Sequence, residues 1–196
     1  MTKIIVFSNM YPSENHPTFG IFVKNQVTLL EENGITPIVV AIQEPGKGKW
    51  TKLMKYSSWL TRSFFTMWKN RHHLSLTHAH YIFPTGVLSY YGKKWFGIPY
   101  VVTAHGGDID QMAKKSPRIH RWTKRILQYA DEVIAVGEKL KADIVQQFEV
   151  KEEKVHVISM GVNRSIFHVM PQELSRETLH LSKEATILLY VGNVIR

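Results

Sequence analysis

Residues 3–42 read KIIVFSNMYPSENHPTFGIFVKNQVTLLEENGITPIVVAI, and the fold class can be inferred from this segment. Lys3–Ser8 is a short apolar run typical of a buried strand, and Thr36–Ile42 is a second run of the same kind. Between them, Gly20–Asn33 has apolar residues at helical spacing, and Gly34 stands where a glycine often ends a helix. A strand, a helix and a strand in this order predict two parallel strands joined by a crossover.

The rest of the chain repeats this alternation. Further strands are expected at Leu76–His80, Pro99–Thr103, Asp131–Val136, Val155–Ile158 and Ala185–Val191, and helices at Trp50–Lys69, Pro84–Phe96, from Ser116-Pro117 onward and at Glu138–Phe148. The pattern predicts an α/β fold, a Rossmann-like parallel sheet with helices on both faces. Such sheets bind ligands at the carboxyl ends of their strands, near the point where the strand order reverses. We therefore expect the loops after Ser8 and after Thr103 to lie side by side.

Composition restricts the class of protein. The chain has 196 residues, a net charge of +9 and no cysteine, and 44% of its residues are hydrophobic. These values are typical of a folded globular chain of one domain or slightly more. The absence of cysteine excludes disulfides, zinc–cysteine sites and cysteine nucleophiles. No apolar run has the length of a signal-peptide core or a membrane span, so we expect a cytoplasmic protein.

The positive charge is concentrated in one window. No Asp or Glu occurs from Pro45 through Gly107, whereas the rest of the chain holds sixteen basic and sixteen acidic residues. The window contains Lys47, Lys49, Lys52, Lys55, Arg62, Lys69, Arg71, Lys93 and Lys94. Such a local field favours an anionic ligand, an anionic membrane or nucleic acid. We expect no nucleic acid partner, because neither a recognition-helix motif nor a basic-aromatic strand signature is present.

Two expected helices carry basic faces. In Trp50–Lys69, the basic residues fall largely opposite an apolar face, and Trp59 lies among them. A tryptophan on a basic face suits an anionic bilayer, but the more common arrangement is a sheet-covering helix with a solvated outer face. A basic stripe also follows Ser116. The expected membrane or anion surface comprises Lys52, Lys55, Trp59, Arg62, Arg118, Arg121 and Arg125.

The loop from Ser8 to Gly20 is long enough to suggest a function. It ends with Gly20 at a helix start, where free N–H groups and the helix dipole favour an anion. The segment is neither GxGxxG nor a P-loop, so no dinucleotide or P-loop site is expected. The alternative is that Gly20 only allows the chain to turn and binds no anion, and the sequence does not decide between the two.

The loop after Thr103 contains the most promising candidate. His105 could donate to a sugar hydroxyl or act as an acid or base, and Gly106 and Gly107 let backbone N–H groups converge on a ligand. His80 would line the same crevice. Asp108-Ile109-Asp110 is a weak metal–nucleotide pattern, and His78 with His80 lacks a third ligand, so we expect no metal site.

Several motifs in order resemble one family. They are TFGIF at 18–22, HGGDI at 105–109, ADEVIAVGEKLK at 130–141, KVHVISMGVNRSIF at 154–167 and ILLYVG at 187–192. Together they resemble the retaining nucleotide-sugar glycosyltransferases of family 4, which have the GT-B fold. The resemblance implies an N-terminal acceptor domain and a C-terminal donor domain with the active site between them. It places Gly20 near the donor phosphates and His105 beside the transferred sugar, with no cofactor besides the nucleotide-sugar substrate.

The resemblance also implies a division of the chain. Residues 1–170 would form the acceptor-binding domain, and residues 171–196 a linker and the first strand of a truncated donor domain. Where the family often has Pro-Asn-Gly-Val-Asp, residues 159–163 read Ser-Met-Gly-Val-Asn, and Gly192-Asn193 stands in place of a Gly-Arg pair. The expected catalytic residue is His105. The expected substrate-binding residues are Asn9, Gly20, His80, Gly106, Gly107, Asp108, Gly192 and Asn193.

The expected function is therefore the N-terminal part of a glycosyltransferase in surface polysaccharide or glycolipid synthesis. The expected partners are a nucleotide-sugar donor, a glycan or lipid-linked acceptor, a C-terminal donor domain and the inner face of an anionic membrane. We expect residues 1–196 alone to be inactive. The alternatives are a nucleotide-sugar 2-epimerase of the same fold and a non-catalytic module that binds anions or membranes.

Overall fold

The computed structural model describes residues 2–45, 48–162, 164 and 166–192, and the side chain of Lys49 is outside the description. It divides into two compact units, Met1–Met160 and Gly161–Arg196. None of the described helices combines the length and the apolar character that a membrane span requires. The expected domain boundary near residue 170 stays a prediction.

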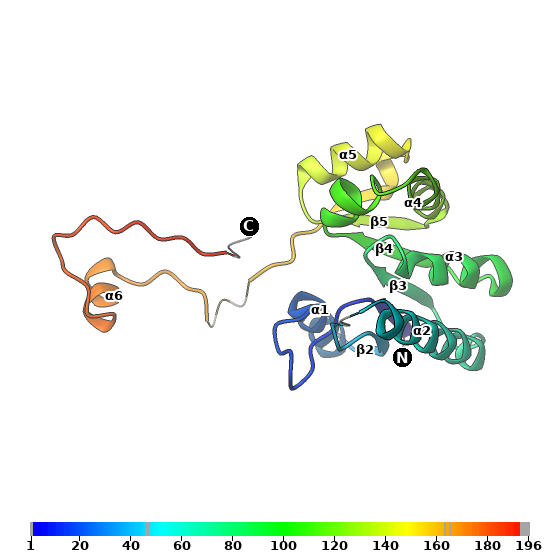
Figure 1. Ribbon diagram of the computed structural model, residues 1–196, viewed down its shortest axis with the longest axis horizontal. Helices are drawn as coiled ribbons and strands as arrows, with labels where there is room; N and C mark the ends of the chain where they lie inside the picture. The colour runs from blue at the N-terminus through cyan, green and yellow to red at the C-terminus, as the bar shows by residue number, and fades with distance from the viewer. Residues whose placement is uncertain (1, 46–47, 163, 165, 193–196) are drawn as a thin grey trace. The chain divides into compact units, whose positions relative to one another are not determined.

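A six-stranded parallel sheet organises the larger unit (Figure 1). Its strands are β1 (Thr2–Ser8), β2 (Ile35–Ala41), β3 (Leu76–His80), β4 (Tyr100–Ala104), β5 (Glu132–Ala135) and β6 (Val155–Val157), in the order β2-β1-β3-β4-β5-β6. The parallel pairing confirms the expected α/β, Rossmann-like fold. β1 pairs with both β2 and β3, so the strand order reverses at β1.

This order corrects one expectation. The loops after Ser8 and after Thr103 are not on neighbouring strands, because β3 pairs with β1 on one side and with β4 on the other. After β2 the chain crosses back over β1, so β3 is added on the other side of β1, where the strand order reverses. The end of β3 thus joins the other two loops at the carboxyl edge of the sheet.

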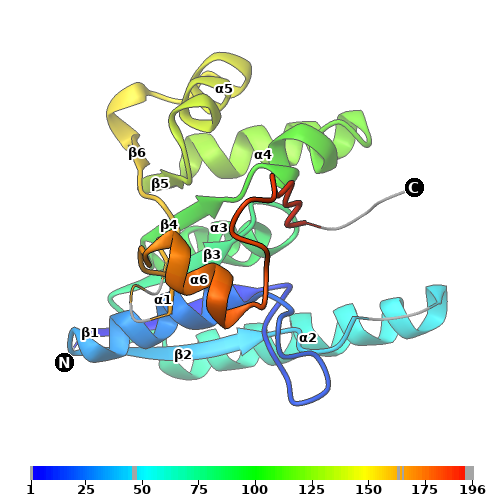
Figure 2. The same cartoon turned by 90° about the vertical axis from the view of Figure 1, so that its left-hand side faces the viewer.

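Five helices cover the sheet: α1 (Ile21–Glu32), α2 (Lys49–Asn70), α3 (Thr85–Phe96), α4 (Pro117–Tyr129) and α5 (Glu138–Phe148). Alternation along β1 sends Ile4 and Val6 toward α1, while Ile5 and Phe7 pack with residues of α2 and α3. Figure 1 and Figure 2 both show α2 near β2, and α4 and α5 beside β5. The helices therefore occupy both faces, as a parallel sheet requires.

Local signals placed the helix ends correctly. Ser116 caps α4, because its side chain accepts a hydrogen bond from the backbone N–H of Ile119, and Pro117 occupies the first helical position. Gly34 follows α1 with a φ of 78°. Gly97 follows α3 in the left-handed region and donates to the carbonyl of Lys93.

The orientation of α2 overturns an expectation. Trp59 is only 2% exposed, and its indole N–H donates to the carbonyl of Val40 at 3.0 Å. Arg62 donates to the carbonyl of Ala41 at 2.7 Å, and Lys55 donates to the carbonyl of Glu44 at 2.9 Å. The side that was expected to be a solvated basic face thus packs on β2 and its end. Helical spacing separates two faces, but it does not state which of them meets the sheet.

The smaller unit differs from its expectation as well. It contains one described helix, α6 (Gln172–Thr178), whereas the expected strand at 185–191 is not formed. A strand needs a partner for its backbone groups, and no described residue of this unit pairs with it. Arg176 instead donates to the carbonyls of Ser182, Lys183 and Ala185. Gly192 is exposed, and Asn193 lies outside the described residues.

Candidate functional site

Three histidines stack at the carboxyl edge of the sheet. The ring centroids of His78 and His80 are 4.5 Å apart, and those of His80 and His105 are 5.5 Å apart. Residue His80 at the end of β3 is in register with Thr103 of β4, so the chain reaches His105 two residues later. His80 Nδ1 lies 3.2 Å from His105 Nε2, and His78 Nε2 lies 2.7 Å from the hydroxyl of Thr103.

Two aromatic residues complete this cluster, which we call the histidine site (Phe22, His78, His80, Tyr81 and His105). The ring of His105 lies 4.7 Å from each of the rings of Phe22 and Tyr81. Tyr81 has a φ of 67°, an uncommon value for a residue with a side chain, which turns the chain as it leaves β3. Neither aromatic residue was a candidate from sequence. The signals were their positions, directly after His80 and two residues after Gly20.

Burial keeps these histidines neutral. It lowers the pKa of His105 to about 4, and together with the nearby His105 it lowers the pKa of His78 to about 4. The pKa of His80 is also well below its usual value, because burial and its two histidine neighbours disfavour the charged form. Each ring therefore has one N–H donor and one acceptor nitrogen near pH 7.

The hydrogen bonds favour one proton arrangement. His80 Nε2 is buried and has no partner among the described residues. A buried acceptor without a partner is more common in proteins than a buried N–H without one. The proton of His80 is therefore assigned to Nδ1, which donates to His105 Nε2. The proton of His105 is then on its Nδ1, which has no hydrogen-bond partner within the described ranges and can donate to a ligand.

Asp108 fixes the loop that carries His105. Its carboxylate accepts hydrogen bonds from the backbone N–H groups of His105 at 3.1 Å and Ile82 at 3.2 Å, and its residue is 2% exposed. Burial raises the pKa of Asp108 to about 6, although the backbone hydrogen bonds oppose the shift. These bonds tie the turn after β3 to the turn after β4. Asp108 begins a π-helical turn, Asp108–Met112, so the Asp-Ile-Asp pattern starts a turn.

The glycines near the site have different constraints. Gly106 has a φ of 92°, and space is open at the Cβ position of both Gly106 and Gly107, which leaves room for a ligand. Gly20 has a φ of 72°, and a Cβ there would lie 2.6 Å from the backbone of Met10. Gly20 is therefore required by the fold, and its expected role at a phosphate stays a prediction.

Asn9 begins the loop that follows β1. Ser8 is in register with His80, so Asn9 leaves the sheet beside the end of β3. Its side-chain oxygen is buried and has no hydrogen-bond partner within the described ranges. A buried polar atom without a partner is costly and often marks the place of a ligand or water. This observation supports Asn9 as a substrate-binding candidate.

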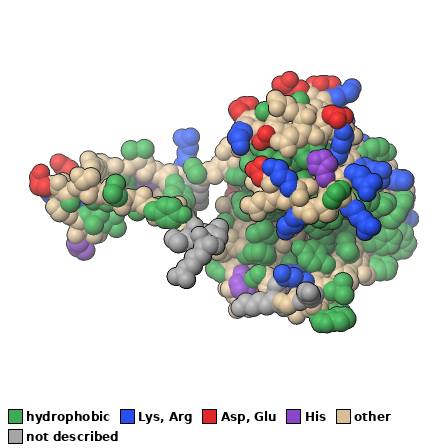
Figure 3. Space-filling model, turned by 45° about the horizontal axis from the view of Figure 1, so that its top comes forward, with side chains coloured by type: hydrophobic (Ala, Val, Ile, Leu, Met, Phe, Trp, Pro, Cys, Tyr) green, Lys and Arg blue, Asp and Glu red, His purple; other side chains and the backbone are tan. Residues whose placement is uncertain are grey.

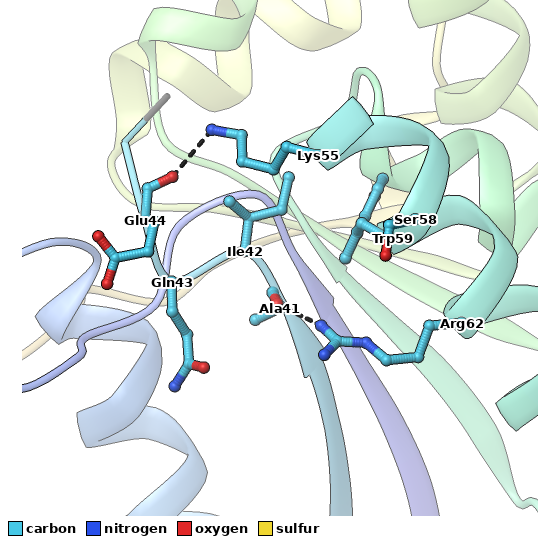
Figure 4. Close-up of a pocket in the computed structure, with 8 residues that line it drawn as sticks. All are labelled: Ala41, Ile42, Gln43, Glu44, Lys55, Ser58, Trp59 and Arg62. Atoms are coloured by element: carbon cyan, nitrogen blue, oxygen red, sulfur yellow. Dashed lines mark hydrogen bonds between the residues drawn. The ribbon is translucent and has the colours of Figure 1, made fainter. Parts of the chain in front are cut away.

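A second feature of this edge is a pocket of about 240 Å³ at the end of β2 (Figure 4). Its lining comprises Ala41, Ile42, Gln43, Glu44, Lys55, Ser58, Trp59 and Arg62. Burial lowers the pKa of Lys55, the charge of Lys52 lowers it further, and Glu44 opposes the shift. Two cationic groups and one carboxylate therefore border the same hollow.

The remaining candidates are not among the residues of the histidine site. Arg118, Arg121 and Arg125 are exposed on α4, around the half-buried Trp122. Gly192 belongs to the smaller unit, whose position relative to the sheet is not determined. Among the described residues, no group of three or more His, Asp or Glu side chains is placed to hold a metal ion.

Similar proteins agree with this architecture. The glycosyltransferase TuaC of Bacillus subtilis, described as a putative enzyme of teichuronic acid biosynthesis, is 23% identical over 99% of this chain and 59% of its own length. The crystal structure of Anabaena HepE with UDP and glucose has a TM-score of 0.58 and 18% identity, over 92% of this chain and 50% of HepE. A UDP-GlcNAc 2-epimerase from Methanocaldococcus jannaschii has a TM-score of 0.53 and 13% identity, over 81% of this chain and 45% of the epimerase.

Two statements follow from these comparisons. The chain spans about half the length of the proteins that it matches. The match to Glycosyltransferase Family 4 extends over residues 20–165, from the glycine before α1 past the last strand. This region includes His80, His105 and Asp108. The chain belongs to Glycosyltransferase Family 4.

Proposed function

We propose that this chain is the acceptor-binding half of a retaining glycosyltransferase, which moves a sugar from a nucleotide-sugar donor to a glycan or a lipid-linked acceptor. The observation that carries the proposal is the position of His105 at the carboxyl edge of a Family 4 sheet, with its Nε2 3.2 Å from His80 Nδ1. The complex of HepE with UDP and glucose supports a nucleotide-sugar donor. A donor-binding half would supply the remaining length.

His105 would act as a hydrogen-bond donor. A histidine with a pKa of about 4 is neutral near pH 7, with one N–H and no positive charge, so it is unsuited to serve as a general acid there. Its Nδ1–H would instead bind a hydroxyl of the transferred sugar and fix the reacting carbon. Positioning of this kind and stabilisation of the departing diphosphate lower the barrier without a protein nucleophile.

The neighbouring residues would assist in different ways. Asp108 would hold the His105 loop, and Gly106 and Gly107 would leave room for the sugar. The buried oxygen of Asn9 would accept a hydrogen bond from substrate. Gly20 would let a phosphate approach the N-terminus of α1, whereas Gly192 and Asn193 would belong to the donor side.

The acceptor would carry negative charge. Lys55 and Arg62 line the pocket at the end of β2, and the chain from Pro45 through Gly107 contains no acidic residue. The name of TuaC, which refers to teichuronic acid biosynthesis, supports an acidic polymer as product. We therefore assign the chain to surface polysaccharide or glycolipid synthesis, acting at the cytoplasmic face of a membrane that presents a lipid-linked acceptor.

The test uses the complete enzyme, meaning this chain together with a donor-binding half. UDP-glucose and related donors are offered with a lipid-linked acidic acceptor, and the anomeric configuration of the product is determined by NMR. We expect retention of configuration. The variant His105→Ala should lose turnover, whereas the exposed control His73→Ala should keep full turnover. Residues 1–196 alone should transfer no sugar. Inversion of configuration, or full turnover in His105→Ala, would contradict the proposal.

A second candidate is a nucleotide-sugar 2-epimerase, which the fold similarity to the Methanocaldococcus jannaschii enzyme supports more weakly. Such an enzyme converts its donor when no acceptor is present. Donor consumption in that control reaction, followed by NMR, separates the two activities. A non-catalytic module that binds anions or membranes would show neither reaction.

A further inference from the structure

The outward side of α2 is apolar. Seven large hydrophobic side chains of this helix are exposed, and Trp95 of the neighbouring α3 is exposed beside them. We call this set the outer strip: Trp50, Leu53, Met54, Leu60, Phe64, Phe65, Trp68 and Trp95. Phe65 is 57% exposed and Trp50 is 81% exposed, so these residues lie on the surface. A contiguous exposed apolar area marks an interaction surface.

Aromatic contacts extend the strip from α2 across α3 to α4. The rings of Phe64 and Trp95 are 6.2 Å apart, and those of Trp95 and Tyr91 stack at 4.6 Å. Tyr91 in turn lies 6.0 Å from Trp122 of α4, over which the guanidinium of Arg125 sits at 5.5 Å. Trp122 and the three exposed arginines of α4 line a pocket of about 270 Å³. The apolar area therefore leads directly into a basic hollow.

The charges along this surface have one sign. α2, α3 and α4 contain no Asp or Glu. Lys55, Arg62, Lys93 and Lys124 bind groups of the protein itself. The exposed basic residues of α3 and α4 that have no such partner within the described ranges are Lys94, Arg118 and Arg121, whereas Lys52 and Lys69 fall on the side of α2 that is largely opposite the outer strip. Figure 3 shows hydrophobic side chains gathered on the right-hand side of the larger unit, with Lys and Arg beside them.

We propose that the outer strip docks on an anionic lipid bilayer. Its aromatic side chains enter the boundary between head groups and acyl chains, and Lys94 and the arginines of α4 bind lipid phosphates. An apolar helix face with tryptophans and bordering basic residues is the pattern of helices that lie in a membrane surface. Each Lys or Arg near an anionic leaflet adds to the attraction.

Charge argues against a second copy as the occupant. A two-fold dimer would place the same surface on both protomers, and the basic residues would then face one another without acidic partners. An anionic bilayer complements both the apolar side chains and the positive charge. Docking would bring the enzyme to the lipid-linked acceptor of the proposed function, and in this respect the inference rests on the proposed function. Vesicle binding needs neither donor nor acceptor, so the two can fail separately.

The test is co-sedimentation of the 196-residue chain with vesicles of phosphatidylcholine alone or with 30% phosphatidylglycerol. We expect binding to the anionic vesicles about tenfold or more above binding to the neutral ones, and a blue shift of tryptophan emission. F65S and W68S remove half-exposed aromatic groups, and each should weaken binding about tenfold. Arg121→Glu should weaken binding by a similar factor, more strongly at low salt.

Matched controls exclude a general effect of polarity or charge. Leu29→Ser changes a residue of α1 that is 56% exposed, and Lys139→Glu reverses an exposed charge on α5. Both should bind vesicles as the unchanged chain does, and circular dichroism should report the same fold for all variants. Equal loss in the controls and in F65S or W68S would overturn the proposal, as would equal binding to neutral and anionic vesicles.

Other occupants would give different results. Concentration-dependent self-association in analytical ultracentrifugation that F65S abolishes, without vesicle binding, would assign the strip to a second copy. A chain that neither binds vesicles nor self-associates would point to a protein partner. Either result overturns docking on lipid.

Discussion

The histidine site and the outer strip differ in what each of them lacks. At the histidine site, buried polar atoms such as His80 Nε2 have no hydrogen-bond partner among the described residues. On the outer strip, large apolar side chains such as Phe65 are exposed to water. Both conditions cost free energy in the isolated chain, for opposite reasons. The comparison teaches that a ligand that forms hydrogen bonds suits the first region, and an apolar surface suits the second.

The largest expected effect separates the two sides of α2. Trp59→Ala removes a buried indole and leaves the carbonyl of Val40 without its partner, so it should lower the free energy of unfolding by about 3–5 kcal/mol. Phe65→Ser should change it by no more than about 0.5 kcal/mol, because the side chain is exposed. Urea denaturation measures both values. A large loss of stability in Phe65→Ser would show that the outer strip holds the fold together.

The next prediction concerns His105. In the complete enzyme, His105→Ala should reduce kcat/KM by about 10²–10³, because one oriented hydrogen-bond donor is lost where the sugar reacts. The same change on the outer strip, Phe65→Ala, should leave kcat/KM for a water-soluble acceptor unchanged. Steady-state kinetics with both variants compares the two regions directly. Similar losses in both would remove the distinction between them.

Acid should destabilise the histidine site selectively. His78 and His105 have pKa values of about 4 in the folded chain, against about 6.5 when unfolded, so the unfolded state binds more protons between these limits. The free energy of unfolding should therefore fall as the pH drops from 6.5 toward 4. The raised pKa of Asp108, about 6, works in the opposite direction and offsets part of the loss.

The expected net loss between pH 7 and pH 5 from His78, His105 and Asp108 is about 2 kcal/mol, and the lowered pKa of His80 adds to this loss. Urea denaturation at both pH values measures it, and His78→Asn should flatten the dependence. The exposed control His73→Gln should retain the full slope. A pH-independent stability would mean that the histidines are not desolvated as the structure indicates.

The smallest predicted effect concerns His80 as a positioning residue. His80→Leu removes the donor to His105 Nε2, so the proton of His105 should distribute between its two nitrogens. Nitrogen-15 NMR of the 196-residue chain reports this tautomer directly, and kcat of the complete enzyme should fall about tenfold. His80→Asn, which keeps an amide donor, should restore the Nδ1–H form in part. An unchanged tautomer in His80→Leu would contradict the assigned proton arrangement.

Local signals predicted much of the fold and part of the site. Strand and helix alternation, the Ser116 cap and the position of His105 after β4 all follow from neighbouring residues, and the structure agrees with them. The β1–β3 pairing and the contacts of Phe22 and Tyr81 with His105 depend on residues far apart in sequence. No periodicity in one segment contains that information.

The prediction of how α2 is oriented was wrong for a related reason. Its two faces were identified correctly, but the choice between them depends on what β2 offers at its end. The carbonyls of Val40 and Ala41 accept hydrogen bonds from Trp59 and Arg62, and these bonds draw the polar side of the helix onto the sheet. Hydrophobicity alone would have chosen the opposite side.

These same bonds have a mechanical consequence. Because Trp59 and Arg62 join α2 to the end of β2 by directional hydrogen bonds, the helix resists rolling about its own axis. On a surface to which the outer strip docked, the pocket formed by β2 and α2 would therefore stay at a fixed distance from that surface. An acceptor anchored in that surface would have to span this fixed distance to reach the pocket. The length of its head group would then decide which lipid-linked chains can be extended.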